Sequence, residues 1–129
     1  MKKLTAVILT LTVILAPING YAGNITWDGD GGDQWWTTDG NWEGGTAPTG
    51  DPSNNEVLYF EGTTGTNNNN DIVDGTFSGI IFSDDASDNT FTIDGNPIDL
   101  AGNITNNDDN NQIINFTQIT MDNALSIDA

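Results

Sequence analysis

The chain has no cysteine and no histidine, and its only basic side chains are Lys2 and Lys3. These absences exclude disulfides, thiol chemistry, zinc sites built from Cys or His, and every Ser–His or Cys–His catalytic triad. Residues 23–129 carry 19 carboxylates and no cationic side chain. Nucleic-acid binding and phosphate-handling loops are therefore excluded too, because both use Lys or Arg to contact phosphate. The length allows one small domain at most.

Residues 1–22 have the organisation of a signal peptide. Two lysines precede an apolar run from Leu4 to Leu15, and the small residues Gly20 and Ala22 occupy the −3 and −1 positions of a cleavage site. The run is shorter than the roughly 20 residues that a membrane-spanning helix needs. We therefore predict cleavage near Ala22, export, and a mature chain without a membrane span. The alternative is a retained N-terminal anchor.

The composition of residues 23–129 favours an all-β fold with short strands and many turns. This region contains 17 Asn, 16 Asp and 14 Gly, residues that favour tight turns, whereas good helix formers are scarce. The high charge favours disorder, but alternating apolar residues oppose it, because such pairs place both side chains on one face of a strand. The pairs are Phe91/Ile93, Ile98/Leu100, Ile114/Phe116, Ile119/Met121 and Leu125/Ile127.

A repeat of 23 residues aligns much of this pattern with itself. It places Phe91 on Ile114 and Ile104 on Ile127, and the earlier strand candidates Glu56–Phe60 and Gly79–Ser83 fit the same offset. Short strands that recur at this period are typical of a β-solenoid, in which stacked rungs bury one continuous core. We predict about three to four rungs over residues 55–129; the alternative is a β-sandwich.

Within that solenoid, Ile93, Leu100, Ile104 and Phe116 are predicted to point inward. The asparagine-rich stretch that contains residues 67–70 is predicted to be a turn, because Asn favours turns over strands.

Residues 23–54 are predicted to cap the solenoid. They contain all four tryptophans, Trp27, Trp35, Trp36 and Trp42, and large aromatic side chains suit the open hydrophobic end of a first rung. The alternative is a sugar-binding surface. Because Trp35 and Trp36 are adjacent, one of them faces outward if the segment is extended, and that side chain is the ligand-binding candidate.

Asp28, Asp30 and Asp33 lie within six residues on a glycine-rich loop and form a candidate Ca²⁺ site. The loop departs from the EF-hand pattern, since Gly32 occupies a ligand position and no Glu closes the loop. A polar turn is the alternative, with a diffuse requirement for cations set by the high negative charge.

Catalysis would have to use paired carboxylates. The candidates are Asp84, Asp85 and Asp88 in one cluster and Asp108 with Asp109 in another, and both lie in turn-forming sequence. A polysaccharide-cleaving enzyme needs a long groove, and lyase chemistry needs a basic residue. We therefore predict that the chain is not an enzyme and keep an acidic glycosidase fragment as the third hypothesis.

Several motifs, taken in order, resemble the autotransporter-associated β-strand repeat proteins. They are Thr26-Trp27-Asp28-Gly29, Asn41-Trp42, Ala47-Pro48, the strand Glu56–Phe60, Gly79-Ile80-Ile81-Phe82 and Gly102-Asn103-Ile104-Thr105-Asn106. The resemblance covers nearly all of residues 25–128.

This resemblance implies a right-handed parallel β-helix passenger, secreted or displayed at the bacterial outer-membrane surface, with a structural or adhesive role. It implies no required cofactor apart from the Ca²⁺ considered above. The partners that it implies are surface glycans or other cell-surface proteins. Family members are usually far longer, so the chain is expected to be the N-terminal part of a protein with further repeats or a translocator. The alternative function is a small carbohydrate- or Ca²⁺-dependent binding module.

Overall fold

The computed structural model describes residues 23–84, 89–121 and 127–128. These residues form strands and two 3₁₀ helices, and they contain no α-helix. In chain order the elements are β1 (Asn24–Trp27), η1 (Asp39–Asn41), η2 (Pro52–Asn54), β2 (Val57–Phe60), β3 (Asn67–Asn70), β4 (Gly75–Phe77), β5 (Gly79–Phe82), β6 (Thr92–Gly95), β7 (Ile98–Leu100), β8 (Ile104–Asn106), β9 (Ile113–Phe116), β10 (Ile119–Met121) and β11 (Ile127–Asp128).

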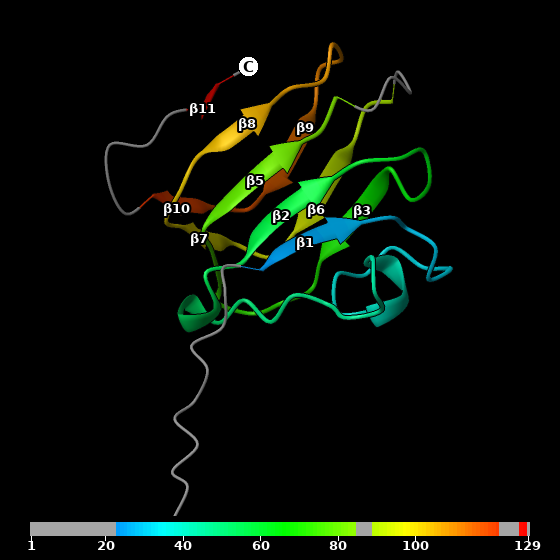
Figure 1. The fold of residues 1–129 in the computed structure, drawn as a ribbon. Coiled ribbons are helices and arrows are strands. Elements are labelled where there is room, and N and C mark those ends of the chain that lie inside the picture. Colours follow the sequence, from blue (N-terminus) through cyan, green and yellow to red (C-terminus); the bar gives the residue numbers. More distant parts are fainter. Residues whose placement is uncertain (1–22, 85–88, 122–126, 129) are drawn as a thin grey trace, which may run out of the picture.

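The strands form three parallel sheets, and from β2 onward every third strand belongs to the same sheet (Figure 1). Sheet A has the order β1-β2-β5-β8-β11, sheet B the order β3-β6-β9, and sheet C the order β4-β7-β10. Each step along a sheet therefore follows one passage of the chain through the other two sheets. The prediction of an all-β fold is confirmed. No helix in the described part of the chain is long and apolar enough to cross a membrane.

The pairing register shows that the repeat length varies from one passage to the next. In sheet A, Leu58 pairs with Ile80, Ile80 with Ile104 and Ile104 with Ile127, at spacings of 22, 24 and 23 residues. The fixed 23-residue offset is thus right for the last pair. It is wrong in sheet B, where Ile114 pairs with Ile93 and not with Phe91. Burial of alternate residues fixes the register of each strand, whereas the turns between strands absorb extra residues.

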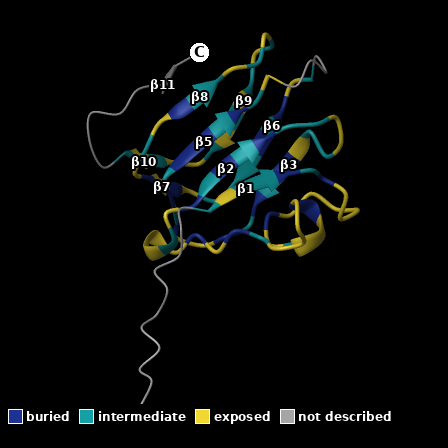
Figure 2. Cartoon of the chain, viewed as in Figure 1, coloured by how far each residue is buried: buried dark blue, intermediate teal, exposed yellow. Residues whose placement is uncertain are grey.

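Buried residues of all three sheets, dark blue in Figure 2, belong to one hydrophobic core. Ile93, Leu100 and Ile104 are buried, as predicted. Phe116, the fourth predicted core residue, is only half-buried in β9, although its ring packs against the core and lies 5.8 Å from the ring of Trp36. Gly95 lies between Phe116 and Asn70 in this sheet and has a φ of +123°, a conformation that L side chains rarely adopt.

The asparagine run Asn67–Asn70, predicted as a turn, is strand β3. Asn68 and Asn70 are buried, and their amides bond inside the core. The Asn68 Oδ1 atom accepts a hydrogen bond of 2.8 Å from the indole Nε1 of Trp36, and the Asn70 Oδ1 atom accepts one of 3.0 Å from the Ile72 amide. Buried amides cost little when they are bonded in this way. Pairing with β6 thus overrides the local preference of Asn for turns.

The segment between β1 and β2 covers the outer edge of β1 (Figure 1). Trp42 pairs with Trp27 in an antiparallel bridge, and the Glu43 amide donates a 2.8 Å hydrogen bond to the Thr26 carbonyl. Trp27, Trp36 and Trp42 are buried, with exposed fractions of 1% or less. An uncovered edge strand offers unpaired backbone groups to other chains, so this segment protects one end of sheet A.

The far end of the same segment is held by Glu56, which directly precedes β2. Its buried carboxylate accepts hydrogen bonds of 2.8–3.1 Å from the amides of Thr49 and Gly50 and from the Thr49 hydroxyl. The Gly50 carbonyl in turn accepts a 2.9 Å hydrogen bond from the Thr76 amide in β4. A single side chain therefore ties this part of the segment to sheets A and C.

Candidate functional site

The two adjacent tryptophans face opposite sides of the chain. Trp35 pairs with Asn69 of β3, because the Asn69 amide donates to the Gln34 carbonyl at 2.7 Å and its carbonyl accepts from the Trp36 amide at 3.1 Å. In such an extended segment successive side chains alternate. Trp36 is completely buried, whereas 45% of Trp35 is exposed. Trp35 is therefore the outward member of the predicted pair and the one that can meet a ligand.

Trp35 begins a row of side chains on the outer face of sheet B. The register continues the row through Asn69, Asp94 and Asn115. The Asn115 amide group donates a 3.0 Å hydrogen bond to the Asp94 carboxylate. A neighbouring row on the same face contains Asn67, Thr92 and Ile113, the last of which is 44% exposed. This outer face was not identified from the sequence.

The predicted calcium ligands are divided between two environments. The carboxylate of Asp28 accepts a hydrogen bond from the Asp30 amide at 3.1 Å. The carboxylate of Asp33 turns into its own loop and accepts hydrogen bonds from the Trp35 amide, the Thr38 hydroxyl and the Asn41 side-chain amide, at 2.8–3.0 Å. Asp33 thus shapes the loop that presents Trp35.

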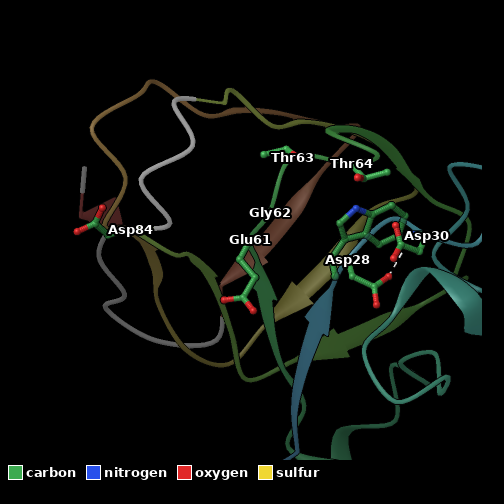
Figure 3. A pocket seen from close by; sticks show the side chains of 8 residues that line it. Asp28, Asp30, Glu61, Gly62, Thr63, Thr64 and Asp84 are labelled. Atoms are coloured by element: carbon green, nitrogen blue, oxygen red, sulfur yellow. Dashed lines mark hydrogen bonds between the residues drawn. The ribbon is translucent and has the colours of Figure 1, made fainter.

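An open depression of about 640 Å³ lies over the loops that follow β1, β2 and β5 (Figure 3). Its rim consists of Trp27, Asp28, Asp30, Glu61, Gly62, Thr63, Thr64 and Asp84. Figure 3 shows Asp28 and Asp30 together on one side and Asp84 apart on the other. Within the described ranges, no three acidic side chains are gathered closely enough to hold a metal ion. The Ca²⁺ site at Asp28, Asp30 and Asp33 therefore stays a prediction, and a diffuse effect of cations stays its alternative.

The described carboxylates considered for glycosidase chemistry lie in different surroundings. Asp84 lies on the rim of the depression, while Asp85 and Asp88 are outside the described residues. Asp108 is half-buried in a turn, where its carboxylate accepts hydrogen bonds of 2.8 and 3.0 Å from Asn110. Its role there is to stabilise the turn.

Comparison of the chain with protein-family models, curated proteins and solved structures finds no match. The likeness to autotransporter-associated β-strand repeat proteins therefore depends on the sequence motifs and stays a resemblance.

Replacing Asp33 by asparagine is expected to destabilise the loop in a pH-dependent way. The hydrogen bond from the Trp35 amide, followed by that from Thr38, holds the pKa of Asp33 below its ordinary value of 3.8. A lowered pKa stabilises the folded state above the unfolded-state pKa, and this contribution is lost as the pH falls through the folded-state pKa. The difference in melting temperature between wild type and Asp33→Asn should have its full size near pH 6 and should shrink below pH 3.8.

Asp30→Asn is the matched control, because it removes the same charge from an exposed side chain of the same loop. A melting-temperature difference for Asp33→Asn that does not change with pH would contradict this role of the carboxylate.

Divalent cations are expected to stabilise the protein through screening, without preference for Ca²⁺. The 19 carboxylates repel one another, and added salt weakens this repulsion. CaCl₂, MgCl₂ and NaCl at equal ionic strength should therefore raise the melting temperature by similar amounts, in wild type and in Asp28→Asn alike. A larger rise with Ca²⁺ that Asp28→Asn removes would instead demonstrate a specific site.

Proposed function

We propose that this chain is a non-catalytic, exported β-solenoid that acts as a structural or adhesive element at the bacterial cell surface. The observation that carries the proposal is the parallel register of the three sheets. Leu58, Ile80 and Ile104 form one inward column, while Tyr59, Ile81 and Thr105 form the adjacent column, which is less buried. Stacked passages of this kind build a rigid body whose length grows by one strand spacing, about 4.8 Å, per passage.

The covered edge of β1 supports the same interpretation. A solenoid used as a stalk needs one end that does not pair with other chains, and the antiparallel contact between Trp27 and Trp42 supplies it. The right hand of the coil follows from the resemblance to the repeat family, as does display at the outer membrane. The signal-peptide pattern in residues 1–22 supports export.

The experiment is expression of residues 1–129 in a bacterium with an outer membrane, followed by cell fractionation. The expected product is extracytoplasmic, accessible to added protease in intact cells or secreted, and begins at or near Gly23 on N-terminal sequencing. Leu11→Arg, which interrupts the apolar run of residues 4–15, should keep the chain in the cytoplasm. A cytoplasmic wild-type product that begins at Met1 would contradict the proposal.

A further inference from the structure

We propose that the outer face of sheet B binds a neutral glycan chain, with a sugar ring stacked on the indole of Trp35 and the following amides bonded to sugar hydroxyls. This face, here called the Trp35 face, consists of Trp35, Asn67, Asn69, Thr92, Asp94, Ile113 and Asn115. The inference rests on the proposed function and names the class of surface partner that an adhesive role requires.

The exposure of Trp35 is the first argument. Its three fellow tryptophans expose 1% of their surface or less, whereas Trp35 exposes 45%. The Trp35 backbone is nevertheless fixed. Asn69 forms backbone hydrogen bonds with both neighbouring residues, Gln34 and Trp36, and the Trp35 amide donates a 3.0 Å hydrogen bond to Asp33. A rigid, exposed indole offers a flat apolar surface at a small cost in conformational entropy, and this suits the apolar face of a sugar ring.

The polar row beside Trp35 is the second argument. Asn69, Asp94 and Asn115 follow Trp35 along the sheet at successive strand positions. Neighbouring strands lie about 4.8 Å apart, so the row from Trp35 to Asn115 extends roughly 14 Å over an open surface. A row of this length suits a polymer better than a small molecule. Asparagine side chains both donate and accept hydrogen bonds, which matches the hydroxyl groups of a glycan.

The charge of the face points to a neutral partner. The chain has 19 carboxylates, yet the seven residues of the Trp35 face include only Asp94, and that carboxylate is bonded by Asn115. Acidic polymers are repelled by the surrounding charge. The depression lined by Asp28, Asp30 and Glu61 has more carboxylates than the Trp35 face, so a cationic partner would bind there more favourably. An uncharged polyol is the ligand that this face selects.

The exposed apolar side chains agree with this assignment. Among the described residues, the large hydrophobic side chains that are exposed are Trp35, Val73 and Ile113. Two of the three lie on the Trp35 face, Trp35 on the bridge beside β3 and Ile113 in β9. They offer an apolar contact at each end of the polar row.

The test is calorimetric titration of the exported, processed protein with cellohexaose, hexa-N-acetylchitohexaose and the acidic comparator hexagalacturonate. We expect a neutral hexasaccharide to bind and to protect Trp35, the one exposed tryptophan, from quenching by acrylamide. Trp35→Ala should weaken this binding at least about tenfold, the size of effect that loss of one aromatic stacking partner gives. Trp35→Phe should retain part of the affinity, and hexagalacturonate should bind at least about tenfold more weakly than the neutral sugar.

Two further variants keep the test decisive. Asn115→Asp replaces an amide that donates and accepts by a carboxylate that only accepts, so it removes a donor for sugar hydroxyls and should weaken binding several-fold, independently of Trp35. Val73→Ala, which truncates an exposed apolar residue away from this face, should leave the affinity unchanged. Circular dichroism and a cooperative melt establish that each variant is folded.

The inference is overturned if a folded wild-type protein binds neither neutral hexasaccharide, if folded Trp35→Ala binds as tightly as wild type, or if hexagalacturonate binds equally well. Self-association that Trp35→Ala abolishes, without sugar binding, would show a homotypic interface in its place. These results are separate from the localisation experiment. An exported chain without sugar affinity loses only this inference, whereas a cytoplasmic chain that binds sugar contradicts the proposed function alone.

Discussion

Trp36→Ala is expected to remove much of the protein's stability. The Trp36 ring is completely buried and packs with its centroid 5.7–6.0 Å from those of Trp42, Phe60, Phe77 and Phe116. Truncating a buried aromatic side chain to alanine costs about 3–5 kcal/mol. The substitution also removes the donor to Asn68 Oδ1, and a buried acceptor without a partner costs about 1–3 kcal/mol more. The total free energy of unfolding of a domain of this size is roughly 5–15 kcal/mol.

Urea unfolding, followed by circular dichroism, measures this effect, and the adjacent residue is its control. Trp35→Ala removes a side chain of the same size from an exposed position, so it should cost less than about 1 kcal/mol. Similar midpoints for the two variants would show that Trp36 does not hold the core together.

Three of the strands that the sequence predicted correctly have alternating apolar residues. Phe91/Ile93, Ile98/Leu100 and Ile114/Phe116 each mark a strand, at β6, β7 and β9. Alternation is local, because it reflects one buried and one solvated face in the strand itself. The pairing register is not local. It depends on turn lengths that differ from one passage to the next. A fixed offset of 23 residues was therefore right for Ile104 with Ile127 and for β4 with β7, but wrong for β6 with β9.

Strand β3 shows where local reasoning fails. The four asparagines Asn67–Asn70 have poor strand propensity, and nothing in their sequence predicts burial. Their partners are distant: Trp36 lies 32 residues before Asn68, and Asn96 lies 26 residues after Asn70. Only the assembled sheets supply the hydrogen bonds that make buried amides acceptable.

The candidate site was predictable in part. Adjacency alone indicated that one of Trp35 and Trp36 faces outward, but which one is decided by the bridge to Asn69. Asp33 was predicted to bind Ca²⁺ because it lies near other carboxylates in the sequence. Its oxygens instead accept hydrogen bonds from Trp35 and Asn41 within its own loop. The rest of the Trp35 face comes from three separate passages of the chain, and no sequence spacing links Asn69, Asp94 and Asn115.

Glu56 was not identified as important from the sequence, because a single glutamate before a strand is unremarkable in so acidic a chain. Its exposed fraction is 4%, and its carboxylate receives all of its described hydrogen bonds from Thr49 and Gly50. Since Gly50 also bonds the Thr76 amide, the carboxylate connects the segment before β2 to sheet C. This connection makes Glu56 the second residue whose replacement has a large effect.

Glu56→Ala is expected to cost about 3–5 kcal/mol, because it leaves the buried amide of Gly50 without its acceptor and removes the charge-assisted hydrogen bonds from the exposed Thr49. Glu56→Gln keeps one acceptor oxygen but points an NH₂ group at backbone donors, so we expect about 1.5–3 kcal/mol. Glu43→Gln, at an exposed position, removes the same charge and relieves the same repulsion, so it should be neutral or slightly stabilising.

Urea unfolding gives the three free energies, and hydrogen exchange should show early loss of protection at Thr49, Gly50 and Thr76. Superimposable curves for Glu56→Gln and Glu43→Gln would contradict the anchor, since charge alone would then explain both. Glu56→Ala should lose the most stability, Glu56→Gln less, and Glu43→Gln the least. This order follows from the number of hydrogen-bond donors that each variant leaves unpaired.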